Sequence, residues 1–196
     1  MNLTHDVLEN RFVRLEPLAQ AHKEDLRAAC AADPALFHDL YPYSLLGEAF
    51  DKRWDGPIAA DRAAGTWLHY AVMVDGRCVG MTCFIFPDAV NASVEVGGTY
   101  YDPAFRGGAT NPASKRLMMG AAFGAGARRV VYRVDGINLR SRAAVLKLGA
   151  TQEGVLRRER LTWTGRIRDT VVFSILDDEW PTVRDRLDAR LAALEA

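Results

Sequence analysis

The spacing of apolar and polar residues along the chain predicts short strands and amphipathic helices in irregular alternation. Residues 11–16 alternate apolar and charged side chains, which is typical of a half-buried strand. The turn residues Asp75–Gly76 and Thr164–Gly165 each predict a hairpin. Strands are predicted at 11–16, 67–75, 77–86, 92–101, 130–134, 152–163 and 167–176.

Proline, asparagine and glycine residues set the ends of the predicted helices. Pro112 suits the first helical position, and Asn111 before it suits the N-cap. Asn138 is a second candidate cap, and the helix after it ends at Gly149. Helices are predicted at 18–33, about 47–64, 112–123, 139–148 and from 181 onward, the remainder of 34–66 being a loop. The last helix is predicted to bury one stripe: Val183, Leu187, Leu191 and Leu194.

The order β-α-α-β-β-β-α-β-α-β-β-α alternates too irregularly for a doubly wound fold. It predicts an α+β fold with a mixed sheet. Neither an internal repeat nor a low-complexity tract divides the sequence, so residues 1–196 are predicted to form a single domain.

Composition narrows the classes of function. The formal net charge is zero, because 25 basic residues balance 25 acidic ones, which argues against nucleic-acid or membrane-surface binding. No uncharged apolar run approaches 18 residues, and the amino-terminal residues lack a targeting pattern. The three cysteines form no CxxC motif and the four histidines show no ligand spacing. We therefore expect a cytoplasmic protein without a metal.

A glycine-rich segment joins the strand that ends near 101 to the helix that begins near 112. Free N–H groups of such a loop and of the first helical turn favour an anion, and glycine lets a phosphate approach the main chain. A tight turn without a ligand is the alternative interpretation. The segment lacks GxxxxGK[ST], and Gly124 and Gly126 follow a helix, so the P-loop and the dinucleotide fingerprint are both excluded.

Three stretches together resemble the GNAT superfamily of acyl-CoA-dependent N-acetyltransferases, in particular its RimJ/RimL-type branch. They are EVGGTYYDPAFRGGATN at 95–111, NLRSRAAVLKLGA at 138–150, and the tail segments EGVLR, RDT and EWP that begin at 153, 168 and 179. With the element order, the resemblance covers residues 11–181. It implies a mostly antiparallel mixed sheet of six to seven strands, with helices on both faces and a splayed central strand pair.

The resemblance also implies acetyl-CoA as co-substrate, with its pyrophosphate held by loop amides. Placing the family's small positions on Gly107 and Ala109 puts Ala104 where glutamine or arginine is usual, which departs from the family's pattern. Arg106 lies two residues further along the loop. The strand before the loop would hydrogen-bond the pantetheine arm. The coenzyme-binding residues implied are Thr99, Tyr101, Phe105, Arg106, Gly107, Gly108, Ala109, Thr110, Asn111, Asn138 and Ser141.

Glu95 is the candidate catalytic base. It lies mid-strand in an apolar run, where burial would raise its pKa towards a useful range. The alternative is a structural acid paired with Arg133 or Arg157. Strict alternation predicts that Glu95, Gly97 and Thr99 share one face, while the two glycines at 97–98 would form a bulge or leave room for substrate.

Ser141 is the candidate acid that protonates the leaving thiolate, with Tyr100 and Tyr101 as alternatives. Relatives often use a tyrosine further along this helix, where this chain has Lys147 and Leu148. Ser141 is otherwise a solvated helix residue. Asn138 is a helix cap, a coenzyme contact, or both.

The function predicted is acetyl transfer to a primary amine, of a peptide or protein N-terminus or a small molecule, by direct attack in a ternary complex. Alternatives are a non-catalytic acyl-CoA sensor and a small-molecule or antibiotic detoxifying acetyltransferase.

The family resemblance implies that the aromatic residues of 34–66 line the acceptor pocket; the alternative is that they fill the core. The arginines of the last hairpin face an acidic substrate, the 3′-phosphate of the coenzyme, or solvent. Because relatives often dimerise, a homodimer is one option.

Overall fold

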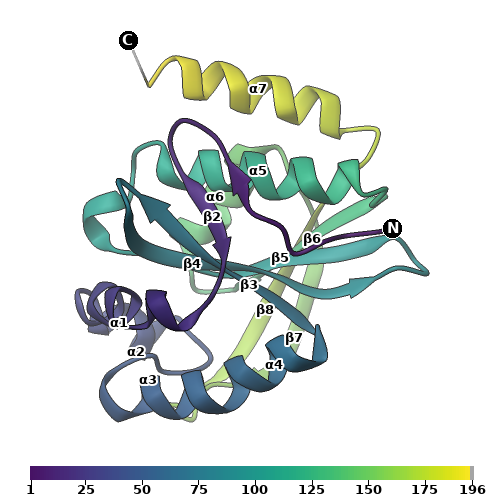
Figure 1. Cartoon of the computed structure of the whole chain (residues 1–196). Helices are drawn as coiled ribbons and strands as arrows, with labels where there is room; N and C mark the ends of the chain where they lie inside the picture. Colours follow the sequence, from purple (N-terminus) through teal and green to yellow (C-terminus); the bar gives the residue numbers. More distant parts are fainter. Residues whose placement is uncertain (195–196) are drawn as a thin grey trace.

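The strands pair edge to edge in the order β1-β2-β3-β4-β5-β6-β8-β7 in this computed structural model, which describes residues 1–194 (Figure 1). The eight strands are β1 (Leu8–Glu9), β2 (Arg14–Pro17), β3 (Trp67–Val74), β4 (Arg77–Asp88), β5 (Ser93–Tyr101), β6 (Arg129–Asp135), β7 (Thr151–Leu161) and β8 (Ile167–Leu176). Neighbours are antiparallel except β5 and β6, which are parallel. The predicted mixed, mostly antiparallel sheet is confirmed, but the predicted count of six to seven strands omitted the two-residue β1.

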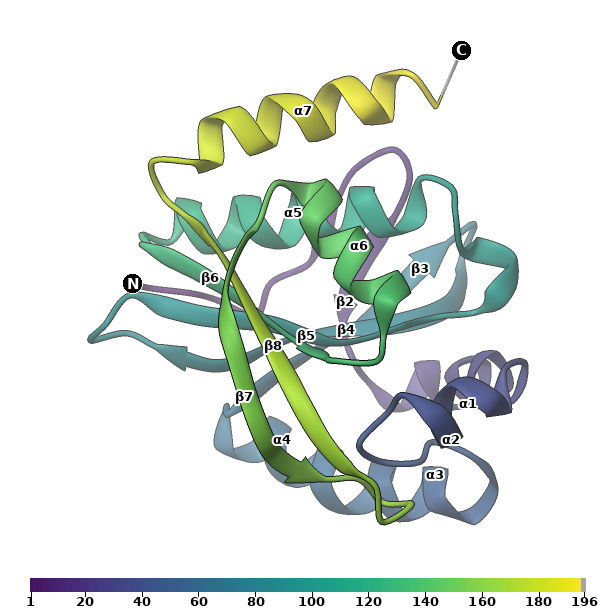
Figure 2. The ribbon, with the colours of Figure 1, turned by 180° about the vertical axis from the view of Figure 1, so that it is seen from behind.

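Helices cover both faces of the sheet, as predicted. They are α1 (Lys23–Ala31), α2 (Pro34–Asp39), α3 (Gly47–Arg53), α4 (Ala59–Ala64), α5 (Thr110–Gly124), α6 (Leu139–Leu148) and α7 (Trp180–Ala192). Figure 1 shows α5 and α7 on one side of the sheet and α1 to α4 on the other. Figure 2 shows α6 on the α5 side and the β7–β8 hairpin reaching towards the α2–α4 layer. No helix within residues 1–194 is long and apolar enough to cross a membrane.

Each face of the sheet has its own apolar core. Met118, Met119 and Ala122 of α5 pack with one set of strand residues, while Phe37, Phe50 and other residues of the α1–α4 layer pack against the opposite face. The predicted helix over 47–64 is confirmed as an uninterrupted helical run, in which α3 continues through a π-turn at Trp54–Ile58 into α4.

Some predicted element ends are wrong. α5 begins at Thr110 with Ala109 as N-cap, so Asn111 is inside the first turn rather than at the cap. Pro112 is still tolerated, because N–H groups of a first turn have no intrahelical acceptor. The α2 helix lies in a segment predicted to be loop, where the Asp33 side chain caps it. Leu194 is exposed, so the buried stripe of α7 ends at Leu191.

A bulge in β5 overturns the predicted alternation. Met81 pairs with Tyr100 and Cys83 with Gly97, so β5 has one residue more than β4 between these pairs. Gly98 has φ +57, which suits glycine. The extra residue turns Tyr101 towards the α5 core and Tyr100 towards the α1–α4 core. Thr99 therefore faces α5 rather than sharing a face with Glu95, while the bulge predicted at the two glycines is present.

The central strands β5 and β6 separate after a short paired stretch. Their register covers only Ser93–Glu95 opposite Arg129–Val131. Beyond Val131, β6 continues alongside β8. The splayed strand pair that the family resemblance implied is therefore present, and it opens directly beyond Glu95.

Candidate active site

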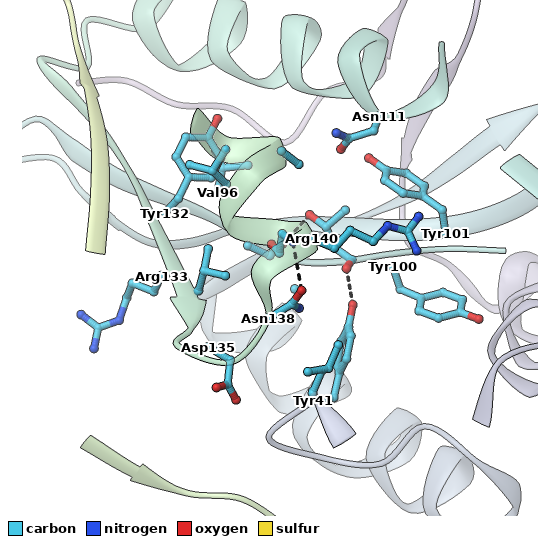
Figure 3. A pocket seen from close by; sticks show the side chains of 18 of the residues that line it. Tyr41, Val96, Tyr100, Tyr101, Asn111, Tyr132, Arg133, Asp135, Asn138 and Arg140 are labelled. Carbon is cyan, nitrogen blue, oxygen red and sulfur yellow. Dashed lines mark hydrogen bonds between the residues drawn. The ribbon is translucent and has the colours of Figure 1, made fainter. Parts of the chain in front are cut away.

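A cavity of about 400 Å³ occupies the opening between the separating strands. The starts of α5 and α6, the loop after α2 and the β7–β8 hairpin complete its wall. Figure 3 shows Tyr41 from the loop after α2 and Asn138 from the start of α6 around one space, with Asn111 and Tyr101 near the start of α5. Most of the predicted coenzyme residues line this cavity, namely Thr99, Tyr101, Arg106, Gly107, Gly108, Asn111, Asn138 and Ser141.

Three of the residues predicted to contact the coenzyme do not line the cavity. Phe105 and Ala109 pack against the apolar core, and Thr110 is buried, its carbonyl accepting a hydrogen bond from the Ser114 hydroxyl. The glycine loop thus contributes through residues 106–108 and the first turn of α5, not along its whole length.

The glycine loop leaves main chain open to the cavity. Gly107 has φ +85, and a Cβ atom added at Gly107 or Gly108 would meet no atom within 4 Å. The Arg106 side chain is turned away to Asp33 and to the Tyr101 carbonyl, and it stacks over the Tyr100 ring. Arg106 therefore anchors the loop to the α1–α4 layer. Main-chain groups are left as the ligands of an anion here.

Asn138 fulfils the predicted capping role. Its side-chain oxygen accepts a hydrogen bond from the Ser141 N–H at 2.9 Å, drawn in Figure 3. Both residues line the cavity, so the cap is also a position that a ligand can touch. Lys147 is exposed and Leu148 buried, so neither supplies an acid to the cavity in place of the family's tyrosine.

The Tyr132 hydroxyl on the cavity wall is buried without a hydrogen-bond partner among the described residues, and the terminal nitrogen Nη2 of Arg106 is in the same state. The Tyr101 hydroxyl, by contrast, has the Ser114 side chain within hydrogen-bond reach. Buried polar groups are normally paired, so the Tyr132 and Arg106 donors would gain from a polar partner. Together with the open main chain at Gly107 and Gly108, they fit a polar, anionic group. Tyr100 is different, because its hydroxyl donates to the Ala29 carbonyl on the other face of the sheet at 2.7 Å, which removes it as an acid candidate.

Glu95 is mostly buried on the cavity wall, next to the opening between the strands. Burial raises its pKa from 4.5 to about 7, against the opposing effect of nearby arginines. Gly97 makes room for the carboxyl group, since a Cβ there would lie 2.9 Å from Glu95 Oε1. A carboxyl group with this pKa exchanges a proton readily near neutral pH.

Arg133 is shared between Glu95 and a second glutamate. Its Nε lies 3.8 Å from Glu95 Oε2, while its Nη2 donates to Glu159 Oε1 at 2.6 Å. The Thr170 hydroxyl also donates to Glu159, at 2.8 Å. Glu159 therefore holds Arg133 and leaves Glu95 with only a distant partner. The arginine partner expected near Glu95 is thus Arg133, whereas Arg157 does not line the cavity.

Lys115 is a buried amine that the sequence reasoning did not single out. It extends from α5 to the Thr99 hydroxyl at 2.7 Å and the Thr82 hydroxyl at 3.3 Å. Burial lowers its pKa to about 7. Its position on the inward face of α5 follows from helical spacing to Pro112 and Met118, which was the signal available in the sequence.

Aromatic residues of the 34–66 segment divide between cavity and core. Tyr41 and Tyr43 line the cavity, and the Tyr41 hydroxyl donates to the Thr99 carbonyl (Figure 3). Phe37, Phe50 and Trp54 are core residues. The core interpretation is therefore confirmed for Phe37, Phe50 and Trp54, while a role of Tyr41 and Tyr43 in the acceptor pocket stays a prediction.

The arginines of the β7–β8 hairpin also differ in whether they line the cavity. Arg160 and Arg168 line the cavity, whereas Arg157 and Arg158 line a separate, shallow surface depression. Arg166 pairs with the buried Asp135 at 2.5 Å. The acidic residues of 34–66 do not line the cavity, and the described residues contain no cluster of three or more potential metal ligands.

Comparison with known proteins decides the family. The family model for an acetyltransferase (GNAT) domain matches residues 13–151. The chain belongs to the GNAT family of acetyltransferases. A search of curated proteins finds no match. The predicted enzyme class, a GNAT-type N-acetyltransferase, is therefore confirmed at the level of the family.

Solved structures of GNAT proteins share the fold along nearly the whole chain. An acetyltransferase from T. thermophilus is 33% identical, with a TM-score of 0.84 over 94% of this chain and 96% of that one. A GCN5-related N-acetyltransferase from Brucella melitensis is 27% identical, with a TM-score of 0.88 over 97% and 87%. Mycobacterium smegmatis RimJ, solved with CoA-disulfide, is 22% identical, with a TM-score of 0.79 over 93% and 90%. The predicted RimJ/RimL-type likeness is confirmed for the fold.

Proposed function

We propose that this GNAT protein transfers an acetyl group from acetyl-CoA to a primary amine by direct attack in a ternary complex. The observation that carries the proposal is the juxtaposition in one cavity of open glycine-loop main chain and a buried carboxyl group with a pKa of about 7. A general base needs this proton affinity near neutral pH, and an anionic coenzyme needs unpaired donors. RimJ, which has the same fold, was solved with a form of CoA.

The residues that would hold the coenzyme lie on the α5 and α6 side of the cavity. Gly107, Gly108 and the first turn of α5 would bind the pyrophosphate through main-chain N–H groups. Thr99 and Tyr101, on the strand that has lost its partner, would bind the pantetheine arm. When bound, acetyl-CoA supplies an activated acetyl group as a thioester.

Glu95 would receive the proton that the acceptor amine loses, directly or through water. The demand on the base depends on the amine, because an α-amino group with a pKa near 8 is about one-tenth neutral at pH 7. A lysine side chain, with a pKa near 10.4, is neutral only about once in a few thousand. We therefore favour α-amines and other amines of low pKa as acceptors.

A proton must also reach the departing thiolate. Ser141 is the proposed donor because it lines the cavity at the start of α6. The Tyr101 hydroxyl is the alternative, since Tyr101 is buried on the same cavity wall. Separately, we propose a cytoplasmic location and a homodimeric state from the family resemblance. The three buried free cysteines fit a reducing compartment such as the cytoplasm.

The test is release of free thiol from acetyl-CoA in the presence of peptides, amino acids, polyamines and aminoglycosides, followed by mass spectrometry of the product. We expect thiol release with at least one class of amine and a product one acetyl group heavier. Binding of acetyl-CoA by calorimetry without thiol release from any amine would favour a non-catalytic sensor instead. No binding and no release would refute both.

A further inference from the structure

Strand β7 departs from regular pairing where it passes the cavity. Leu156 pairs with Thr170 and Arg160 with Arg168, so β7 has more residues than β8 over this stretch. Arg158, inside this bulge, has φ +52, a strained value for a residue with a side chain. Its N–H donates to the Asp169 carboxylate at 2.6 Å, which holds the bulge in place. Bulges beside functional sites often redirect side chains.

This bulge separates the arginines of β7 into two groups. Arg157 and Arg158 face the shallow surface depression and Arg160 faces the cavity, while Glu159 lines both. Arg160 is close enough to Glu95 to oppose the rise in pKa that burial causes there. The bulge therefore brings one guanidinium group to the same chamber as the proposed base.

The acidic groups near Arg160 are already engaged by other residues. Glu159 accepts from Arg133 at 2.6 Å and from Thr170 at 2.8 Å. Asp135, at the end of β6, is paired with Arg166 at 2.5 Å. Arg160 reaches no closer than 4.0 Å to Glu159, its nearest acidic partner among the described residues.

Arg160 is consequently a cation on the cavity wall whose guanidinium donors are available to a ligand. Its side chain is 47% exposed, so a ligand can reach it, while Arg168 is buried beside Asp135. A guanidinium group presents donors in a planar fork that matches a carboxylate. A cationic acceptor such as an aminoglycoside would meet repulsion here instead.

We infer that the acceptor amine belongs to a molecule that also carries a carboxylate, which Arg160 binds while the amine faces Glu95. This inference names a substrate class for the acetyl transfer proposed above and rests on it. An acidic residue next to the amino terminus of a peptide meets the requirement.

The test compares three amidated tripeptides with alanine at both ends and aspartate, asparagine or lysine in the middle. We expect the aspartate peptide to exceed the lysine peptide by about tenfold in kcat/KM at low salt, mainly through KM. About 0.5 M KCl should shrink this ratio, because the site is half exposed. Arg160→Ala should bring the ratio of kcat/KM for the aspartate and lysine peptides near one. Arg160→Glu should make the lysine peptide the better substrate, and Arg160→Lys should keep the preference for aspartate.

Arg157→Ala is the matched control, since Arg157 lies on the same strand but outside the cavity. Its peptide ratio should equal that of the wild type. Thermal melting shows whether each variant is folded, and calorimetry with CoA shows whether coenzyme binding is intact. An Arg160→Ala variant with weaker CoA binding and an unchanged peptide ratio would assign Arg160 to the coenzyme and overturn the inference.

The outcomes separate the inference from the function on which it rests. If no amine of any class releases thiol, acetyl transfer itself is refuted. If the three peptides react equally well, or the lysine peptide reacts best, acetyl transfer stands and carboxylate recognition by Arg160 is wrong.

Discussion

The two halves of the cavity are built from different parts of the chain. The proposed coenzyme half consists of main chain and short local motifs, such as the Gly107 turn and the Asn138 cap. The proposed acceptor half consists of side chains that converge from separate strands, with Glu95 on β5, Arg133 on β6 and Glu159 on β7. Substitutions in the glycine loop should therefore affect coenzyme affinity, and substitutions of Glu95, Arg133 and Glu159 should affect proton transfer.

Each half also contains a buried group whose pKa is about 7. Glu95 and Lys115 are on opposite faces of the bulged strand region, and burial brings both pKa values to about 7, from below for the acid and from above for the amine. Their surroundings differ. Arginines face Glu95, whereas the hydrogen-bond partners of Lys115 are two threonine hydroxyls. The proton affinity of Glu95 is thus adjustable by its neighbours, and that of Lys115 is set by burial.

Glu95→Gln should have the largest effect on the reaction. Loss of a general base typically costs a factor of about 10²–10⁴, and we expect a loss of about 10² or more in kcat at pH 7. The loss should be far smaller at pH 9, where more of the amine is neutral. A pH–rate profile measures this, and an unchanged profile would show that Glu95 is not the base.

Glu153→Gln is the control for that variant. Glu153 is also paired with an arginine, Arg129, but it does not line the cavity. Its pH–rate profile should match that of the wild type.

Lys115→Met tests the other buried group through stability. Folding lowers the pKa of Lys115, so its contribution to stability is present above pH 10.5 and is lost as the pH falls through about 7. Removing the amine should stabilise the protein by about 1–3 kcal/mol at pH 6 and by less at pH 9. The two threonine hydroxyls remain bonded to each other at 2.8 Å.

Thermal or urea unfolding at both pH values measures this difference. Lys147→Met, on the exposed face of α6, is the matched control and should show no such pH dependence. Equal stability changes for Lys115→Met at pH 6 and pH 9 would contradict the assignment of an uncompensated amine.

The difference between the halves also explains what the sequence could predict. The turn at Asp75–Gly76, the Asn138 cap and the glycine loop depend on neighbouring residues, and all were predicted. The partnership of Arg133 with Glu159 depends on three-dimensional pairing of β6, β7 and β8, which periodicity does not specify. Thr99 was assigned to the wrong face because one bulge residue reverses alternation for every position after it.

Gly107→Ala should raise the KM for acetyl-CoA by about tenfold, because it disturbs the glycine loop of the coenzyme half. The alanine must adopt φ +85, and its methyl group would project into open space at the loop. The pH–rate profile should stay unchanged. Gly165→Ala is the control, because Gly165 has φ +83 in the β7–β8 turn, outside the cavity. If both variants raise KM equally, the effect is backbone strain alone.

Glu159→Gln and Arg133→Gln should move the acid limb of the pH–rate profile in opposite directions. Without the Glu159 charge, Arg133 is freer to pair with Glu95 and lowers its pKa, so the rate at pH 6 relative to pH 8 should rise by about threefold. Without Arg133, the pKa of Glu95 should rise further and that ratio should fall. Shifts in the same direction would show that Arg133 does not connect the two glutamates.

Ser141→Ala should have the smallest effect, about twofold to threefold in kcat at pH 7. Thiols have a pKa near 8.5, so a thiolate departs with little help from an acid, and none is needed at pH 9. Ser141→Thr keeps the hydroxyl and should restore the rate. The same modest loss in both variants would reflect packing at the start of α6 rather than proton donation. A large loss at pH 7 that disappears at pH 9 would contradict this expectation. It would show that protonation of the thiolate by Ser141 limits the rate at pH 7.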